Sequence, residues 1–280
     1  MRAGVVSTID GMSRLREKWP QSSAGNLFSE FEYLYAWAQG LPEEQRLHLI
    51  VPEGVRAVVP LVECDSLLSF LAAEMFEMQD LPLAHDAGPD AARAVASALI
   101  QLRMPLHLHR VSADSPVLAA LKEMSRARGI LRVKPVDGSP VIRLSPQWRD
   151  PETRLNSGRR SDLRRMRKKA FESGEVFMEE IVAHPGNVNE CLDRLFTVEA
   201  AGWKGASGSA LRCDAVRSNF FRRFCMSACM RLPVRFFFMR IGESDAAAQL
   251  TVERSGRLWL LRAGYDERFG RCSPGTLLTV

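Results

Sequence analysis

Three β-rich runs near the C-terminus, separated by two short turns, constrain the fold more strongly than any other part of the chain. The runs lie within residues 234–265 and have the sequences VRFFFMRI, AAAQLTVER and RLWLLRAGY. The turns between them are Gly242-Glu243-Ser244-Asp245 and Ser255-Gly256, and these residue types favour tight reversals of the chain. Because strands so close in sequence pair as neighbours, the pattern predicts a three-stranded antiparallel meander.

The last strand of this meander runs into a polar segment and then into Ser273-Pro274-Gly275, which precedes an apolar run. Ser followed by Pro is typical of a helix start, with Ser at the N-cap and Pro at the first helical position. A strand, a loop and a helix N-terminus in this order favour an anion, because unpaired N–H groups and the helix dipole converge there. The sequence therefore predicts an anion-binding site at this junction.

The remainder of the second half predicts alternating helices and strands. Residues 152–174 are long, basic and end in a glycine, which indicates a helix with Leu163, Met166 and Ala170 on one face. A strand over 175–183 follows, then helices that begin at Asn187 and Asp214, with a Gly/Ser-rich loop over 202–209 between them.

The first half also mixes helices and strands. The pattern predicts an amphipathic helix over 26–38, two hairpin strands around Pro52-Glu53-Gly54, a helix over 90–102, a strand over 105–111, a helix that begins at Asp114-Ser115-Pro116, and two short strands, ILRVKPV and PVIRLS, over 130–145. The composition of the chain changes near Pro146, after which basic residues become frequent. We therefore predict two domains, residues 1–149 and residues 150–280.

Composition is that of an ordinary globular protein, with 46% hydrophobic and 25% charged residues. No apolar run approaches the length that spans a bilayer, and the N-terminus lacks the apolar core of a signal peptide, so a cytoplasmic location is expected. The six cysteines form no C-x-x-C pair, which gives no support to a zinc ribbon or a thiol redox pair. A net charge of +5 permits an anionic ligand without requiring nucleic acid.

Two further patterns are open to more than one interpretation. The basic helix is compatible with nucleic acid, but no aromatic residues are interleaved with its charges, so a solvated face or a small anion is favoured. His107 and His109 alternate on a predicted strand and share a face. They have no acidic or cysteine partner near them in sequence, so a structural role is favoured and no metal is predicted.

The segment Glu199-Ala-Ala-Gly-Trp203-Lys204-Gly205 places a carboxylate, an aromatic ring and a cation where a helix gives way to a loop, a common location for functional residues. Trp203 as a core residue and Lys204 as an ordinary surface charge are equally consistent with the pattern. Tyr265 and Asp266 end the last meander strand. Tyr265 is suited to donate a proton, and Asp266 either orients a substrate amine or hydroxyl or organises the turn.

Three motifs in register carry a resemblance to a known family. They are R-R-x-x-L-R-R-x-R-K-K, E-x-x-G-W-K-G and Y-D-E-x-F-x-x-x-S-P-G-x-L-L. Together they resemble the GNAT-superfamily acetyltransferases of the CelD/BioF2-like group (cellulose biosynthesis-type), which are related to the FemAB transferases. The resemblance covers about residues 150–280. It implies an α+β fold in which a mainly antiparallel sheet is flanked by helices, with two GNAT-like halves in tandem, and a family chain that continues beyond Val280.

The resemblance also implies a donor and a reaction. Acetyl-CoA or another acyl-CoA would place its pyrophosphate on the turn, and the cofactor-binding residues would be Arg268, Arg271, Cys272, Ser273, Gly275 and Thr276. The acceptor would attack the thioester directly, which needs a base and a proton donor. Glu199 or Asp266 is expected as the base and Tyr265 as the acid.

The leading hypothesis is therefore an acyl-CoA-dependent N- or O-acetyltransferase that acts on a sugar, a polysaccharide precursor or another small molecule. Trp203 and Lys204 are expected to contact that acceptor. Two alternatives remain open at this point: a FemAB-like transferase that uses aminoacyl-tRNA, and a non-catalytic GNAT-like module that binds a partner.

Overall fold

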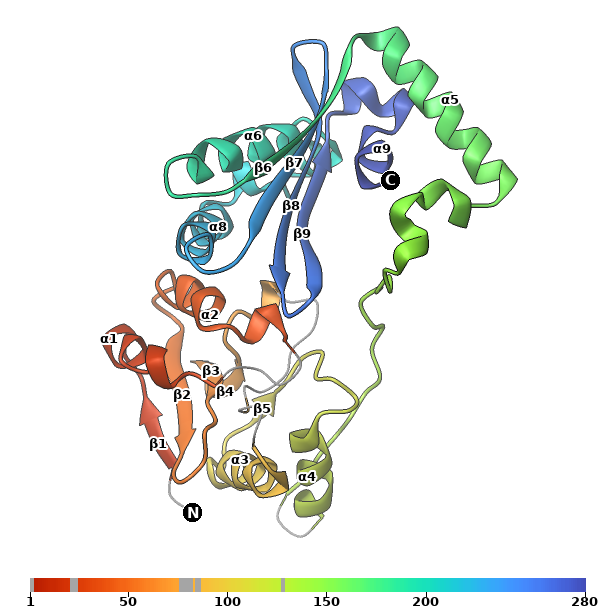
Figure 1. The fold of residues 1–280 in the computed structure, drawn as a ribbon. Helices are drawn as coiled ribbons and strands as arrows, with labels where there is room; N and C mark the ends of the chain where they lie inside the picture. Colours follow the sequence, from red (N-terminus) through yellow and green to blue (C-terminus); the bar gives the residue numbers. More distant parts are fainter. Residues whose placement is uncertain (1–2, 21–24, 76–82, 84–86, 127–128) are drawn as a thin grey trace. The chain divides into compact units, whose positions relative to one another are not determined.

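The chain divides into two α+β units, Met1–Pro140 and Val141–Val280 (Figure 1). The computed structural model describes residues 3–20, 25–75, 83, 87–126 and 129–280. Each unit combines one mainly antiparallel sheet with helices, which confirms the predicted fold class. The division lies at Pro140, whereas the sequence predicted a boundary between residues 149 and 150.

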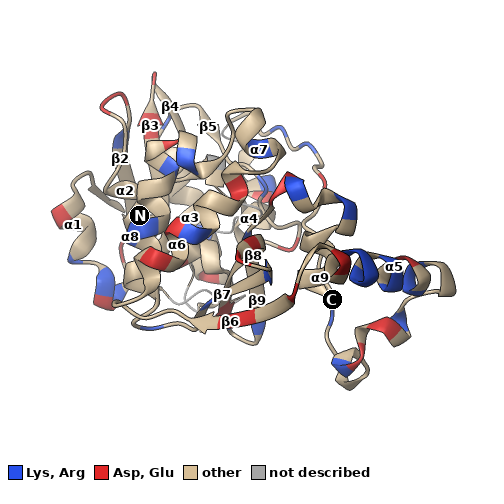
Figure 2. Ribbon diagram, turned by 90° about the horizontal axis from the view of Figure 1, so that it is seen from above, with Lys and Arg blue, Asp and Glu red and all other residues tan. Residues whose placement is uncertain are grey.

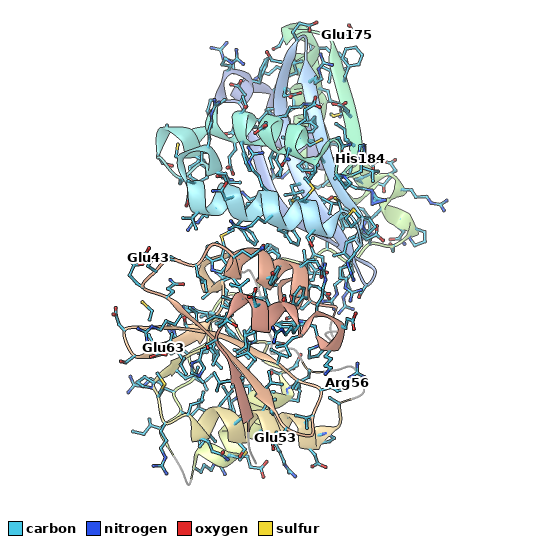
Figure 3. All side chains as sticks on the ribbon, turned by 90° about the vertical axis from the view of Figure 1, so that its left-hand side faces the viewer. Glu43, Glu53, Arg56, Glu63, Glu175 and His184 are labelled. Carbon is cyan, nitrogen blue, oxygen red and sulfur yellow. The ribbon has the colours of Figure 1, made fainter. Side chains whose placement is uncertain are left out.

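The first unit is built on a five-stranded sheet with the order β1-β2-β3-β4-β5. All neighbouring strands are antiparallel except β4 and β5, which run parallel. The hairpin predicted around Pro52-Glu53-Gly54 is present, with Glu53 and Arg56 labelled in its turn (Figure 3). The elements are β1 (Ala3–Val6), α1 (Ile9–Ser13), α2 (Phe31–Ala38), β2 (Arg46–Pro52), β3 (Val59–Cys64), β4 (Leu67–Phe70), α3 (Pro89–Gln101), β5 (Leu106–His107) and α4 (Pro116–Ser125).

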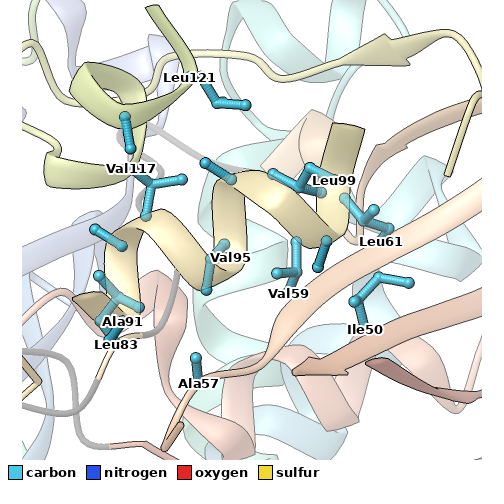
Figure 4. Close-up of a cluster of buried hydrophobic side chains, with 14 of the residues drawn as sticks. Ile50, Ala57, Val59, Leu61, Leu83, Ala91, Val95, Leu99, Val117 and Leu121 are labelled. Carbon is cyan, nitrogen blue, oxygen red and sulfur yellow. The ribbon is translucent and has the colours of Figure 1, made fainter. Parts of the chain in front are cut away.

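The core of this unit lies between the sheet and the helices α3 and α4 (Figure 4). Val59 and Leu61 of β3 face Val95 and Leu99 of α3, and all four side chains are buried. The alternation of apolar residues in β3 and their 3.6-residue period in α3 place both sets on one face. Hydrophobic burial therefore accounts for the packing of α3 on this sheet.

One prediction for the first half is wrong, and another is confirmed only in part. The segment 130–145 forms no strand in the part of the chain that the structure describes, and Ile130 is 98% exposed. Pro135 and Pro140 each remove a backbone donor, and no neighbouring strand pairs with the segment. The strand predicted over 105–111 is shortened to β5, where only Leu106 and His107 pair with β4.

The second unit has a four-stranded sheet with the order β6-β7-β8-β9, antiparallel throughout. The predicted meander is confirmed as β7, β8 and β9. Glu175 and His184 flank β6 in Figure 3. The elements are α5 (Ser157–Ser173), β6 (Val176–Val182), α6 (Val188–Ala200), α7 (Trp203–Ala206), α8 (Ala215–Ala228), β7 (Val234–Ile241), β8 (Ser244–Arg254), β9 (Arg257–Tyr265), the 3-10 helix η7 (Glu267–Cys272) and α9 (Pro274–Thr279).

Helices cover both faces of this sheet. One face packs on α6, whose buried apolar residues follow the predicted helical spacing, and α8 packs on α6 in turn. On the other face, Leu163 and Ala170 of α5 and Leu277 of α9 form a cluster with Met239 and Ala247. The central strand β8 is therefore buried from residue 246 to residue 252.

Local differences from the predictions have simple causes. The predicted loop 202–209 contains the single helical turn α7. Asn187 and Ser273 do occupy N-cap positions, but neither side chain caps its helix. The Asn187 carboxamide accepts instead from the His184 amide at 2.8 Å, and Ser273 adopts a left-handed backbone with φ 48°.

Within the described ranges, no helix combines the length and the apolar character that crossing a membrane requires.

Candidate functional site

The buried carboxylate of Glu199 joins four segments of the second unit. Glu199 is in the last turn of α6 and is 2% exposed. Its Oε1 accepts a hydrogen bond from Lys204 Nζ at 2.9 Å and another from the Arg262 guanidinium. Its Oε2 accepts from the Leu211 amide at 2.8 Å. One side chain thus ties together α6, α7, the segment before α8, and β9.

A β-bulge turns Arg262 toward this carboxylate. Leu250 pairs with Arg262 and Thr251 pairs with Leu260, so Leu261 is an extra residue in β9. Because side chains alternate between the faces of a sheet, one extra residue reverses the faces of all that follow. Without the bulge, Arg262 would face the opposite side of the sheet from α6.

Glycines allow the backbones around Glu199 to approach closely. A Cβ on Gly264 of β9 would lie 2.9 Å from the Glu199 Cα, and one on Gly202 would lie 2.6 Å from the Tyr265 carbonyl oxygen. A Cβ on Gly205 would lie 1.8 Å from the Ala200 carbonyl oxygen. Distances this short exclude a side chain at these positions. The glycines of the G-W-K-G motif are therefore required by packing.

Lys204 is part of this structural cluster. In addition to its bond to Glu199, its Nζ donates to the Ala263 carbonyl oxygen at 2.9 Å. The interpretation of Lys204 as an ordinary surface charge is thus wrong. Trp203, by contrast, is 58% exposed, so it is not a core residue and its indole ring is accessible to a ligand.

Tyr265 connects this cluster to the Ser-Pro-Gly turn. It is the last residue of β9, and its ring would lie 3.7 Å from a Cβ on Gly275. Burial raises the pKa of the Tyr265 phenol, and the neighbouring Glu267 carboxylate, to which it is hydrogen-bonded, raises the pKa further. The phenol therefore stays protonated at neutral pH and is able to donate its proton.

Asp266 organises the turn after β9. Its Oδ1 accepts from the Arg268 amide at 2.9 Å, and its Oδ2 accepts from Arg268 Nε and Nη2 at 2.8 and 2.6 Å. Burial acts to raise the pKa of this carboxyl, but the hydrogen bonds and charge of Arg268 outweigh burial, so the pKa lies below its usual value. Of the two roles that the sequence left open, the geometry favours the turn.

The Ser-Pro-Gly turn offers one backbone donor to a ligand. Pro274 has no N–H, and the amides of Thr276 and Leu277 donate to the Ser273 carbonyl oxygen at 3.0 and 3.2 Å. The Gly275 amide, in the described part of the chain, makes no hydrogen bond. The turn therefore offers an anion fewer free backbone amides than the sequence suggested.

The side chains around the turn differ in their availability. Arg271 is exposed, and no other described residue forms an ion pair or hydrogen bond with it. Thr276 is exposed as well, whereas Arg268 is engaged by Asp266. The Cys272 thiol is buried and donates to the Phe269 carbonyl oxygen at 3.0 Å, so it belongs to the core.

The structure thus brings the two C-terminal motifs of the sequence together. Glu199 and Lys204 contact β9, Gly202 lies against the Tyr265 carbonyl group, and the Tyr265 ring would lie 3.7 Å from a Cβ on Gly275. Sequence reasoning missed Arg262 and Glu267. A bulge leaves no signal in a single sequence, so Arg262 could not have been found, but the Y-D-E motif itself contains Glu267.

The histidine pair of the first unit lies as the sequence predicted. The His107 and His109 rings are 4.1 Å apart between centroids, so they share a face. No group of three or more potential metal ligands occurs among the described residues.

Comparison with known families bears on the second unit. Residues 157–280 match a sequence family described as "Acetyltransferase (GNAT) domain". The match spans α5 to α9 and supports a GNAT-type acetyltransferase domain in this unit. No curated protein matches the chain. The narrower assignment to the CelD/BioF2-like group, with its FemAB relation, stays a prediction.

Two solved structures are similar to the chain at low sequence identity. A conserved protein of unknown function from Bacteroides thetaiotaomicron VPI-5482 has a TM-score of 0.51 and 9% identity, and the alignment covers 99% of this chain and 84% of that one. This similarity shows a shared fold. A tandem GNAT protein from the clavulanic acid biosynthesis pathway, solved without AcCoA, has a TM-score of 0.40 and 13% identity over 99% and 83% of the two chains.

We predict that Glu199→Gln destabilises the protein by about 3 kcal/mol, because it leaves Lys204 and Arg262 without a counter-charge in a buried setting. Chemical denaturation measures the change in unfolding free energy. Glu243→Gln is the control, because Glu243 is fully exposed and its replacement is expected to stay within about 0.5 kcal/mol of wild type. Equal stability of the two variants would contradict the structural role of Glu199.

A second prediction concerns the G-W-K-G glycines. Gly205→Ala forces a Cβ into the Ala200 carbonyl oxygen and is expected to cost about 2 to 3 kcal/mol in thermal unfolding experiments. Gly158→Ala in α5 is the matched control: its Cβ meets Asn156 Oδ1 at an ordinary 3.5 Å, and Ala favours a helix by up to about 1 kcal/mol. A Gly205→Ala variant that melts at the wild-type temperature would contradict the claim that packing requires glycine at this position.

Proposed function

We propose that the second unit transfers an acyl group from acetyl-CoA or another acyl-CoA to an amine or hydroxyl of a sugar, a polysaccharide precursor or another small molecule. The observation that carries this proposal is that the Tyr265 ring lies beside the Gly275 turn, 3.7 Å from where a Cβ on Gly275 would lie. The Gly275 amide, unpaired within the described residues, is a free backbone donor there, and Arg271, in the segment just before the turn, is exposed. The family match over residues 157–280 supports the same reaction class.

The turn residues suit the diphosphate of the donor. The Gly275 amide is available as a hydrogen-bond donor, and Arg271 supplies a flexible cation from η7. Hydrogen bonds from a charged guanidinium to phosphate oxygens are stronger than hydrogen bonds between neutral groups. The Thr276 hydroxyl lies one residue further along the helix. We assign the diphosphate to these three residues, with Arg268 and Cys272 in supporting roles.

Transfer then requires a proton for the departing thiolate. The acceptor nitrogen or oxygen attacks the thioester carbonyl carbon, the carbon–sulfur bond breaks, and the sulfur leaves as a thiolate. Tyr265 delivers its phenolic proton to that sulfur, and the proton that the acceptor nitrogen or oxygen loses passes to solvent water, which returns a proton to the phenolate. Burial and the neighbouring Glu267 raise the pKa of this phenol, so it is protonated at neutral pH and carries the proton that the thiolate needs.

Glu199 and Asp266 are better assigned to positioning than to proton abstraction. Both carboxylates are buried, and both oxygens of each already accept hydrogen bonds, so neither is exposed to an acceptor. Lys204 serves the same cluster. Trp203, with its exposed indole, is the residue that we assign to acceptor contact.

Isothermal titration calorimetry with acetyl-CoA tests the donor site. Wild type is expected to bind, and Gly275→Trp to bind at least tenfold more weakly, because the indole covers the free amide. Gly138→Trp is the matched control, because a Cβ there meets nothing within 4 Å. Binding that Gly275→Trp leaves unchanged would contradict the assignment, and so would wild type that binds no acetyl-CoA.

The proton donor can be tested without knowing the acceptor. An ultraviolet pH titration of wild type minus Tyr265→Phe isolates this phenol from the two other tyrosines. We expect its pKa above the ordinary value of about 10, because burial and Glu267 both favour the neutral form. Glu267→Gln is expected to lower the pKa, and Glu243→Gln to leave it unchanged. A phenol that titrates at or below the ordinary value would refute its role as acid.

A further inference from the structure

The net charge of the whole chain is concentrated on α5. The chain has thirty-eight Lys and Arg residues and thirty-three Asp and Glu residues, a net charge of +5. Helix α5 contains seven of the cations and two of the carboxylates, also +5. The positive and negative charges of all other residues therefore cancel, and the excess positive charge of the protein equals that of α5 (Figure 2).

Three of these cations form a stripe on the exposed face of α5. Arg160, Arg164 and Lys168 are exposed and follow one another at four-residue spacing, so they line one side of the helix over about 12 Å. Arg164 has no ion-pair partner among the described residues, and Lys168 has only the distant Glu172, at 3.8 Å. We call these three residues the basic stripe.

An exposed aromatic residue continues the basic stripe. Phe171 follows Lys168 by three residues and is 64% exposed. It also lines a groove with Met178, Phe237 and Leu278, where α5 and α9 meet the sheet. A row of cations that ends at an exposed phenylalanine is complementary to an acidic surface with an apolar contact point.

The adjoining, buried face of α5 packs beside the Ser-Pro-Gly turn. Leu163 and Ala170 are buried in one cluster with Cys272 and Leu277, which flank the turn on both sides. The charge of Lys169 is close enough to lower the pKa of the Cys272 thiol, although burial raises it more. The basic stripe is thus carried on a helix that is fixed directly to the proposed donor site.

We propose that α5 is the docking surface for an acidic acyl carrier protein, whose phosphopantetheine arm enters the Gly275 turn. This inference rests on the proposed function and adds a protein-borne thioester donor to the acyl-CoA proposed there; the single phosphate of its arm would take the place of the coenzyme A diphosphate at the turn. The arm of a carrier protein is chemically the same as the phosphopantetheine part of coenzyme A. The basic stripe lies outside the turn itself, where a carrier protein would present its own surface.

An acidic carrier protein suits this surface better than a nucleic acid does. Proteins that bind single strands alternate cations with aromatic residues that stack on bases, and the basic stripe contains no aromatic residue between Arg160 and Lys168. Polyanion binding also draws on many phosphate contacts, whereas the remainder of this chain carries no net charge.

The test measures binding of the full chain to four probes: holo acyl carrier protein of a bacterial fatty-acid synthase, its apo form without the arm, acetyl-CoA, and a single-stranded RNA oligonucleotide. The stripe variant is Arg160→Gln/Arg164→Gln/Lys168→Gln. The matched control removes three exposed cations elsewhere, Arg132→Gln/Lys134→Gln/Arg143→Gln. Acetyl-CoA binding and circular dichroism check that each variant is folded.

We expect the holo carrier protein to bind more tightly than the apo form. The stripe variant should lose at least tenfold in affinity for the holo carrier protein, with the loss shrinking at high ionic strength. The control variant should bind like wild type, and acetyl-CoA should bind equally to all three proteins.

The other outcomes distinguish failure of the docking inference from failure of the proposed function. If acetyl-CoA binds but the carrier protein does not, or if the holo and apo forms bind equally, the docking inference is overturned while the proposed function stands. Tighter binding of RNA than of carrier protein, lost in the stripe variant, would likewise overturn it in favour of nucleic acid. If no acetyl-CoA binds to wild type, the proposed function itself fails.

Discussion

The pairing of one buried carboxylate with two cations is the interaction on which the candidate site depends. Removing the charge of Glu199 from water is costly, and the cost is offset only because Lys204, Arg262 and the Leu211 amide all reach it. Lys204 and Leu211 follow Glu199 by 5 and 12 residues, whereas Arg262 lies 63 residues further along the chain than Glu199. The carboxylate therefore holds the end of α6 against β9, which is the strand that leads into the site.

This arrangement explains why Tyr265 is well positioned. Gly264 allows the backbone of α6 to contact β9, and Gly202 allows the next segment to contact the Tyr265 carbonyl group. The phenol is therefore carried on a strand whose neighbours leave it little freedom. Preorganisation of this kind is what a proton donor requires, because a group that must first be oriented during the reaction contributes less to it.

Most helices and strands of the second unit could be predicted from the sequence, whereas the contacts of the site residues could not. The meander could be predicted because its apolar runs are separated by turns too short for any connection other than a hairpin. The segment 130–145 failed because a β-rich pattern does not reveal whether a partner strand exists. The bulge at Leu261 depends on pairing between β8 and β9, and so the contact between Arg262 and Glu199 could not be foreseen.

The same limit applies to the charged residues of the site. Glu199 and Asp266 were expected as candidate bases because direct attack on a thioester needs a group that takes up the proton of the acceptor. Only the structure shows that Arg262 and Arg268 already hold them. The position of Tyr265 was predicted correctly. It ends β9 and comes shortly before Ser273-Pro274-Gly275, and the order of these elements along the chain can be read from the sequence.

A crystal structure of the protein with bound coenzyme A tests the central claim most directly. The account predicts diphosphate oxygens within hydrogen-bonding distance of the Gly275 amide and the Arg271 side chain, with the thiol end of the molecule near the Tyr265 phenol. Coenzyme A bound away from this turn, or with its sulfur remote from Tyr265, would contradict the account.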